Sequence, residues 1–259
     1  MARLSRRVAA SGFYHVTARG NGRQVIFESD EDRLRFLDLL VERLACGSVS
    51  SLAWCLMDNH IHLVLKDADG DMSGLMHGLC CSYAQYFNRR SGHVGHVFQG
   101  RFFSAPLETE AYFLDAVRYV HTNPAADGIC PTETYRWSSY QEYLGVIRDG
   151  MPPVCDTGLV LGLTGGVDGF VSFHAASEGR RYRPRRGLRV PDDEVPELLL
   201  RTSRKLLGYE VAPAAVKALT RHERNSLLCA ARAEGASVRQ IARATGIGDS
   251  TVKRATCMR

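Results

Sequence analysis

The spacing of apolar residues in the first half of the chain switches repeatedly between the two periods of regular secondary structure. Residues 13–18 are rich in β-branched and aromatic side chains and end at a turn-prone Arg-Gly-Asn-Gly stretch. Residues 30–44 instead place apolar side chains every three to four positions, which predicts an amphipathic helix with Asp30 as its N-cap. Applied as far as residue 124, these patterns predict strands at 13–18, 51–57, 60–66 and within 97–107, and helices at 30–44, 71–88 and 109–124.

This order of elements predicts the fold of residues 1–150. Strand, helix, strand, strand, helix and strand, followed by a further helix, is the order of a ferredoxin-like or split βαβ domain, which is an α+β fold. Because that fold hosts many unrelated functions, the function has to be inferred from the residues that the fold brings together.

The regular pattern weakens after residue 145, which divides the chain into three parts. Residues 151–190 contain a Pro-Pro pair, a Gly-Gly pair and an arginine-rich block, which is typical of a loosely structured connector, although residues 159–163 fit a short helix. A helical pattern returns from residue 191 onward. We therefore expect a first domain at 1–150, a connector at 151–190 and a helical DNA-binding domain at 191–259.

Residues 237–255, SVRQIARATGIGDSTVKRA, have the anatomy of a helix-turn-helix. Ile241 and Val252 are the expected inward anchors of the two helices, and Gly246 serves the turn between them. Asp249 or Ser250 is expected to cap the second helix. In a DNA-binding motif of this kind, the side chains expected against DNA are Ser250, Thr251, Lys253 and Arg254. The alternative is an ordinary helical hairpin.

Composition and charge narrow the class of protein. Hydrophobic residues make up 45% of the chain and charged residues 24%, as in soluble globular proteins, and no run approaches the roughly 18 apolar residues of a membrane span. The net charge is 33 − 28 = +5, and residues 179–189 carry six arginines without an acid. That block is either a solvated segment or a contact for a polyanion. The first residues lack the apolar core of a secretory signal, so we expect a cytoplasmic protein with free cysteines.

Two histidines in the run NHIHLVLK are the first candidates for chemistry. Residues two apart on a strand project from the same face, so His60 and His62 point together while Ile61 faces the core. Two imidazoles on one face are good metal ligands when a third group approaches them. Taken alone, such a pair is more often a pair of ordinary polar positions, so a second element is required.

The predicted helix at 110–123 supplies such an element. Its apolar residues cluster on one stripe, whereas Tyr119 and Asn123 lie four residues apart on the opposite side. If that side faces the two histidines, the amide oxygen of Asn123 completes a metal site and Tyr119 lies next to the metal. The alternative is a surface tyrosine and an asparagine that ends a helix before Pro124.

Together these motifs resemble those of a known family. NHIHLVL is similar to the HUH motif, two histidines around a bulky apolar residue, and YVHTNPAADG is similar to the single-tyrosine helix of HUH transposases. The segments FQGRF, RWSSYQEYLG and DEDRLRFLDLL extend the resemblance to REP-associated tyrosine transposases over roughly the first 150 residues. Asp58 stands where relatives often have proline before Asn-His, and this departure leaves every expected ligand in place.

The resemblance implies a reaction and a set of roles. Tyr119 would be the nucleophile, His60 and His62 would bind a divalent metal, and Asn123 occupies the position of the third ligand. The expected reaction is cleavage and rejoining of single-stranded or hairpin DNA through a 5′-phosphotyrosine, with palindromic repeats as the DNA partner. Imidazole ligands suit Mn²⁺ better than Mg²⁺, and either ion can serve. A monomer and a homodimer both remain open.

Accessory groups and alternative functions complete the expectations. On the strand predicted within 97–107, Gln99 and Arg101 share one face, where a guanidinium suits a phosphate clamp; a structural arginine is the alternative. One alternative function is a domesticated, non-catalytic DNA-binding regulator, although the intact tyrosine, histidines and asparagine argue against simple decay. Another is an HUH replication initiator or relaxase, which shares the chemistry.

Overall fold

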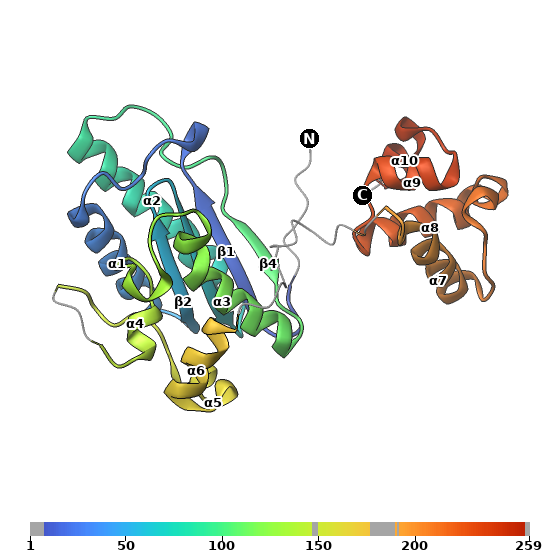
Figure 1. Cartoon of the computed structure of the whole chain (residues 1–259). Coiled ribbons are helices and arrows are strands. Elements are labelled where there is room, and N and C mark those ends of the chain that lie inside the picture. The colour runs from blue at the N-terminus through green and yellow to red at the C-terminus, as the bar shows by residue number, and fades with distance from the viewer. Residues whose placement is uncertain (1–7, 147–149, 177–189, 191, 257–259) are drawn as a thin grey trace. The chain divides into compact units, whose positions relative to one another are not determined.

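The structure is a computed structural model that describes residues 8–146, 150–176, 190 and 192–256. The chain divides into two compact units, residues 1–184 and 185–259 (Figure 1). Each unit has its own hydrophobic core of buried side chains. No helix among these residues is long and apolar enough to cross a membrane.

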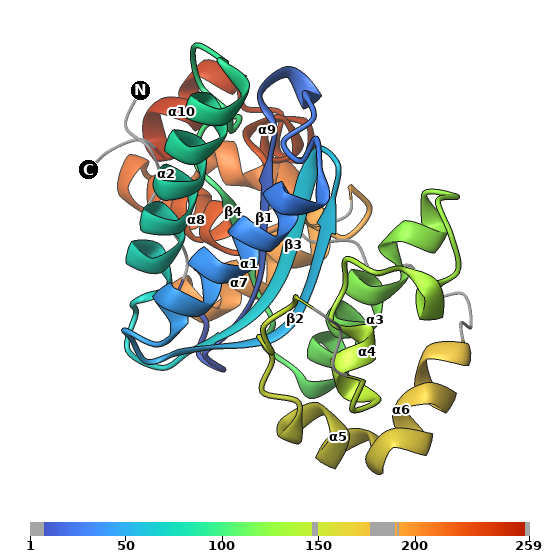
Figure 2. The same cartoon turned by 90° about the vertical axis from the view of Figure 1, so that its left-hand side faces the viewer.

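The first unit is built on a four-stranded antiparallel sheet. The strands are β1 (Phe13–Arg19), β2 (Val49–Met57), β3 (His60–Asp67) and β4 (Phe103–Pro106), in the spatial order β2-β3-β1-β4. Figures 1 and 2 show α1 (Asp30–Leu44) and α2 (Met72–Ser91) on one face of this sheet and α3 (Glu110–Ala126) on the other. This arrangement confirms the predicted ferredoxin-like α+β fold.

Alternation along β3 explains why the sheet has two different faces. Ile61, Leu63 and Leu65 are fully buried on the side that α1 and α2 cover. The alternate residues of β3 project toward α3, and His60 and His62 are among these. A one-residue shift of register would exchange the two sets, so burial of the leucines fixes the direction of the histidines.

The N-cap of helix α1 lies one residue before the expected cap. Ser29, not Asp30, is the N-cap, and it forms a capping box in which its side chain accepts the N–H of Asp32. The Asp32 carboxylate in turn accepts the backbone N–H groups of Glu28 and Ser29. Because Asp32 at the third helical position bonds back to Ser29, Ser29 is the cap in place of the expected Asp30.

Strand β4 is shorter than the sequence predicted, and this corrects the placement of two candidate residues. Gln99 and Arg101 lie in a bent segment before the strand and are not on one strand face. Gly100 between them has a φ of 67°, a left-handed conformation that interrupts an extended strand. The Gln99 N–H still bonds the carbonyl of Arg19 at 2.7 Å, so the segment follows the end of β1.

Helix α3 starts where it was expected. The Thr109 side chain caps it by accepting the N–H of Tyr112. The helix runs past the predicted end and includes Pro124, which lacks the N–H for one backbone hydrogen bond. Its contacts with β2, β3 and the helices that follow hold it on both sides.

Residues 150–176 are not the loose connector that the sequence suggested. After η2 (Thr132–Thr134) and α4 (Tyr140–Tyr143), the chain forms α5 (Gly158–Thr164) and α6 (Gly166–Ala175), which pack within the first unit. Phe170 is fully buried, and its ring stacks on that of Tyr143 with 4.5 Å between centroids. Apolar side chains spaced along α5 and α6 therefore complete the core. The arginine block at 179–189 lies outside the described residues.

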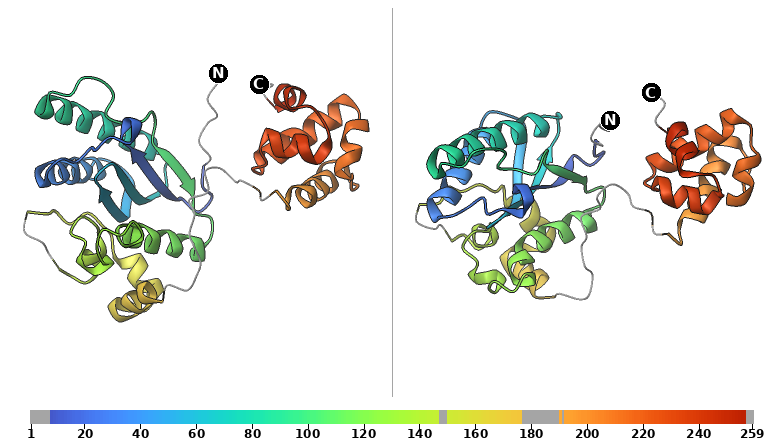
Figure 3. Two further views of the ribbon diagram at one scale, coloured as in Figure 1. Left: turned by 45° about the horizontal axis from the view of Figure 1, so that its top comes forward. Right: turned by 90° about the horizontal axis from the view of Figure 1, so that it is seen from above.

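The second unit is helical, as predicted (Figure 3). Its elements are α7 (Val195–Leu207), η3 (Pro213–Ala218), α8 (Arg221–Ala233), α9 (Val238–Thr245) and α10 (Asp249–Thr256). Ile241 and Val252 are fully buried, and Gly246 ends α9 with a φ of 68°. The two helices and the turn therefore have the predicted anatomy. Helix α10 already includes Asp249, so Gly248 is the residue that precedes it.

Candidate functional site

The site is centred on the two histidines at the start of β3. Their rings lie 4.9 Å apart between centroids and nearly perpendicular, at 85°. His62 is only 5% exposed, whereas His60, the first residue of the strand, is half-buried. The predicted alternation therefore brings both imidazoles to the face of the sheet that α3 covers.

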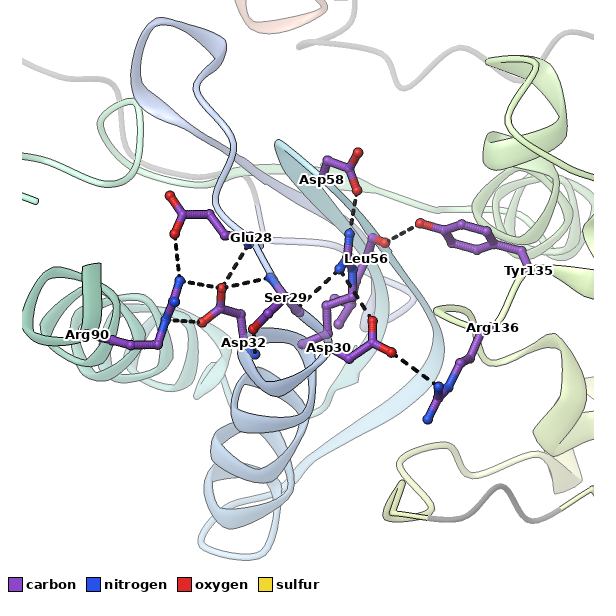
Figure 4. Close-up of polar contacts among 10 residues, drawn as sticks. Glu28, Ser29, Asp30, Asp32, Leu56, Asp58, Arg90, Tyr135 and Arg136 are labelled. Atoms are coloured by element: carbon purple, nitrogen blue, oxygen red, sulfur yellow. Dashed lines mark hydrogen bonds and ion pairs between the residues drawn. The ribbon is translucent and has the colours of Figure 1, made fainter. Parts of the chain in front are cut away.

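A network of charged side chains holds the turn that precedes His60 (Figure 4). Arg33 of α1 forms a short ion pair with Asp58, and the Asp58 carbonyl accepts the N–H groups of Ile26 and Phe27. The Arg33 guanidinium also lies over the rings of Phe27 and Trp137. Asp58, the departure from the family pattern, is therefore anchored to α1, and Asn59 next to it bonds His60 Nδ1 at 2.7 Å.

Tyr119 of α3 lies against the histidines. Its ring centroid is 5.4 Å from that of His62, edge to face at 88°. The phenol is half-buried, so it is neither the free surface tyrosine of the alternative interpretation nor a fully enclosed core residue. Helix α3 therefore brings the phenol and the imidazole pair together from two separate elements.

Asn123 lies one turn further along α3 and is 6% exposed. Its side chain interacts with both His60 and Tyr119. Its Oδ1 atom is buried and accepts no hydrogen bond from the described residues. An unsatisfied buried oxygen is costly in a protein interior, so this atom requires a partner that the described part of the chain does not supply.

Burial keeps the imidazoles of the site uncharged. Desolvation, aided by the nearby charge of Arg19, lowers the pKa of His60. Desolvation also holds the pKa of His62 well below its usual value, and the neighbouring His15, His60 and Arg19 add to this effect. Neutral imidazole is the form that binds a metal ion.

The phenol of Tyr119 responds to burial in the opposite sense. Desolvation raises its pKa, and the hydrogen bond with Asn123 offsets part of this effect. The hydroxyl is therefore protonated at neutral pH, and it has to lose its proton if it is to act as a nucleophile.

His15 is a member of the site that the sequence analysis did not identify. It lies on β1, is fully buried, and its Nε2 atom is 3.0 Å from Nδ1 of His62. Its ring also meets that of Tyr119 edge to face, at 5.7 Å. Burial lowers the pKa of His15 to about 3, so this ring is neutral as well. Alternation along β1 places it on the same face as Thr17, which pairs with His62.

Arg19 is the second residue that the sequence analysis missed. The register pairs it with His60 at the open end of the sheet, and its side chain is exposed. Its charge lowers the pKa of both His60 and His62. It therefore brings a positive potential to the edge of the site.

The donors present fit a divalent metal ion. Two neutral imidazoles share one face, and the buried Asn123 Oδ1 atom beside His60 lacks a hydrogen-bond partner in the described chain. Such a mixed set of nitrogen and oxygen donors suits Mn²⁺ and is compatible with Mg²⁺. Within the described ranges, no three His, Cys, Asp or Glu side chains gather to hold a metal, so the candidate set includes the amide.

The other candidate residues belong to other elements. Gln99 and Arg101 are exposed in the segment before β4. On α10 of the second unit, Ser250, Lys253 and Arg254 are exposed and Thr251 is partly exposed, on the side away from the buried Val252. His121 of α3 is fully buried, contacts Ser139 and His174, and belongs to the core.

Comparisons with known proteins show what the chain is similar to. A solved structure described as a REP-associated tyrosine transposase bound to a REP hairpin is similar in 60% of this chain and 90% of its own, with 18% sequence identity and a TM-score of 0.47. No curated protein matches the chain. Residues 9–123, which contain every member of the cluster, match the family model described as "Transposase IS200 like". Residues 9–123 are therefore similar to the IS200-like transposase family.

Proposed function

We propose that this protein is a metal-dependent, single-tyrosine transposase that cleaves and rejoins single-stranded or hairpin DNA. The observation that carries the proposal is the convergence of the Tyr119 ring with the His62 ring, 5.4 Å apart between centroids. Beside them lies the Asn123 Oδ1 atom, which has no hydrogen-bond partner among the described residues. Tyr119 is the proposed nucleophile, and His60, His62 and Asn123 are the proposed metal ligands. A divalent ion held by these residues would polarise the scissile phosphate and stabilise the charge that develops on it.

The reaction requires one displacement at phosphorus and its reverse. The Tyr119 oxygen forms a bond to the phosphorus, the bond from phosphorus to the 3′ oxygen breaks, and the departing 3′ oxygen takes up a proton. The phenol loses its own proton, a loss that its raised pKa opposes, and this proton balances the one that the 3′ oxygen takes up. The resulting 5′-phosphotyrosine keeps the energy of the broken bond, so the 3′ hydroxyl of another strand can attack it without ATP.

The protein residues have separate tasks in this scheme. The Asn59 contact orients His60, and the His15 contact orients His62. Packing between α3 and the sheet excludes water from most of the Tyr119 ring. Arg19 supplies positive charge at the open end of the site, where the DNA backbone has to enter.

Contacts outside the cluster are proposed to select the DNA. Gln99 and Arg101 would contact the strand near the site, and Ser250, Thr251, Lys253 and Arg254 of the second unit would contact DNA through the helix-turn-helix. The similar solved structure is described as bound to a REP hairpin, which favours a hairpin from a palindromic repeat as the partner here.

A covalent adduct tests the proposal. Incubation of the full chain with a single-stranded hairpin oligonucleotide and Mn²⁺ is expected to give a protein–DNA species that survives a denaturing gel. Tyr119→Phe should abolish this species while DNA binding persists, because only the attacking oxygen is removed. Tyr112→Phe is the matched control on the same helix and should form the adduct. An adduct with Tyr119→Phe would refute the assigned nucleophile, and wild-type binding without any adduct would favour a non-catalytic regulator.

A further inference from the structure

The turn of α3 that carries Tyr119 lacks one of its backbone hydrogen bonds. Pro124 lies inside the helix and has no N–H group, so the carbonyl of Val120 receives no helical bond from it. The Thr122 hydroxyl also donates to the carbonyl of Arg118 at 2.9 Å, a side-chain bond that often bends a helix. Because helices kink at such positions, contacts from outside α3 have to keep this turn in place.

Arg118 joins this turn to α6, which lies beside α3 (Figures 1 and 2). Its guanidinium donates to the carbonyls of Phe173 and Ala176 at the end of α6, at 3.3 and 3.2 Å. The last carbonyls of a helix have no partner within the helix, so an arginine can bind them. The guanidinium also lies over the Phe173 ring at 4.4 Å and pairs with Asp115 at 2.6 Å. Because the side chain is only 16% exposed, these contacts fix it between the two helices.

His121 ties the same turn to α6 and to β2 through a chain of hydrogen bonds. Its Nδ1 atom is 3.0 Å from Nε2 of His174, and its Nε2 atom is 2.8 Å from the Ser139 hydroxyl. At one end of the chain, Nδ1 of His174 is 2.9 Å from the carbonyl of Phe170 in α6. At the other end, the Ser139 oxygen accepts the N–H of Trp54 in β2 at 2.9 Å. The chain therefore runs from the sheet through α3 to α6.

Because both imidazoles are neutral, each bond of this chain has a fixed direction. Burial lowers the pKa of His121 well below its usual value and lowers that of His174 to about 4. A carbonyl can only accept, so His174 carries its proton on Nδ1 and accepts at Nε2. His121 then donates from Nδ1 and accepts the hydrogen bond of the Ser139 hydroxyl at Nε2. A rotation of α3 that moved Tyr119 away from the sheet would break both bonds of His121.

Arg118 and His121 lie on either side of Tyr119 in the sequence, within one turn of α3. At about 100° per residue, the Tyr119 side chain projects roughly 100° away from Arg118 and roughly 160° away from His121. The phenol therefore meets the His62 ring from one side of α3, while α6 is bound on another side. We call the contacts of Arg118 and His121 with α6 the α6 brace.

We propose that Arg118 and His121 are positioning residues, which act through the α6 brace to keep the Tyr119 phenol against His62. This inference rests on the proposed function and deepens it. It assigns a task in the reaction to α6, which lies beyond residues 9–123, the part of the chain that matches the family model. A displacement of about 1 Å can cost about 100-fold in rate, so the brace should act on the rate of attack rather than on DNA binding.

The maximal rate of adduct formation, measured at saturating hairpin DNA and Mn²⁺, tests the proposal. Arg118→Met keeps the unbranched stem but removes the ion pair and both hydrogen bonds to α6. It should lower the maximal rate at least about tenfold and change the half-saturating DNA concentration less than about threefold. Arg118→Lys keeps the charge and can still donate to a carbonyl, so it should recover part of the rate.

Two further variants separate the brace from general effects. Arg43→Met is the matched control, because Arg43 joins α1 to Ser82 of α2 at 3.0 Å, and it should leave the maximal rate within about twofold. Phe173→Leu removes the ring beneath Arg118 without changing the charge. It should lower the maximal rate about threefold, with no further loss when combined with Arg118→Met. Rates are measured where circular dichroism shows every variant to be folded, so a loss of stability alone leaves them unchanged.

Hydrogen exchange separates this proposal from failure of the proposed chemistry. A peptide that covers residues 119–123 should exchange faster in folded Arg118→Met than in the wild type, with or without DNA. Faster exchange together with a wild type that forms no adduct would retain the brace and reject catalysis by Tyr119. A wild-type maximal rate in Arg118→Met, or a loss confined to the half-saturating DNA concentration, would overturn the proposal.

Discussion

At the scale of single residues, the sequence predicted the direction of side chains better than their partners. The spacing of His60 and His62 is enough to place both on one face, because strand alternation is a local property. His15 also alternates correctly along β1, yet its contact with His62 depends on the register between β1 and β3. That register is set by the burial of leucines far away in the sequence, so the partner of His15 could not be read from the local pattern.

The contact between His15 and His62 predicts a loss of metal affinity when His15 is replaced. His15→Phe fills the same space but removes the nitrogen that lies 3.0 Å from His62. We expect the Kd for Mn²⁺, measured by isothermal titration calorimetry, to rise roughly 10- to 100-fold, because partners of this kind orient the ligand.

His77→Phe is the control, since this histidine lies on α2, outside the cluster. Circular dichroism should show that both variants are folded. Unchanged Mn²⁺ affinity in folded His15→Phe would contradict the orienting role.

At the scale of elements, local capping and long-range anchoring act together at the start of α1. The capping box of Ser29 and Asp32 is a local motif and could be predicted from the sequence, although the apolar pattern alone indicated Asp30 as the cap. The anchoring of the Asp58 turn by Arg33 joins residues 25 positions apart and needed the structure. The bent segment before β4 shows the same limit, because Gly100 breaks a strand that the apolar pattern favoured.

This anchoring predicts a specific cost for losing Arg33. Its guanidinium is almost buried, pairs with Asp58 and packs over Phe27 and Trp137. Arg33→Ala should lower the free energy of unfolding by about 2 kcal/mol in urea titrations, because packing and the ion pair are both lost. Arg35→Ala, on the exposed side of the same helix, should change it by less than about 0.5 kcal/mol. Equal costs would refute the anchoring role.

The docking of α6 on α3 predicts a dependence of stability on pH. His174 contacts His121 at 3.0 Å, Arg118 adds a nearby charge, and burial lowers the pKa of His174 to about 4. The unfolded state, with a pKa of about 6.5, therefore binds the proton first as the pH falls. This site should remove about 2–3 kcal/mol of stability between pH 6.5 and 4.

The measurement is the free energy of unfolding across that range for the wild type and His174→Gln. The variant should show a shallower decline toward acid pH, whatever its stability at pH 7. Parallel curves would show that His174 does not titrate on unfolding.

At the scale of the whole molecule, the chain has two cores, and its helical C-terminal unit was predicted from the apolar pattern and the Gly turn. The boundary of the first unit was placed too early, at residue 150. Pro and Gly pairs occur in the turns around short helices such as α5 and α6 as readily as in a linker. The composition of residues 151–176 therefore could not distinguish the two. The burial of Phe170 against His121 of α3 is a tertiary contact, which amino-acid composition cannot predict.

The second unit predicts a separable contribution to DNA binding. Lys253 and Arg254 are exposed on α10, so replacing both with alanine should lower affinity for duplex DNA and reduce the slope of log K against log salt by about 2. The adduct formed by Tyr119 on a short unpaired strand should be unaffected. Lys205→Ala with Arg204→Ala, on α7, removes the same charge as a control. An unchanged slope in the α10 variant would argue against DNA contact by this helix.

The most direct test of the central claim is to locate the DNA-linked residue by mass spectrometry. Trypsin cleaves after Arg118 and Arg136, so Tyr119 begins a peptide that also holds Tyr135 near its end. After reaction with hairpin DNA and Mn²⁺, then digestion by nuclease and trypsin, fragmentation should place the nucleotide on Tyr119, and chelation of the ion should abolish the modified peptide. A nucleotide attached to any other residue, or one that forms equally well without a divalent ion, would contradict the account.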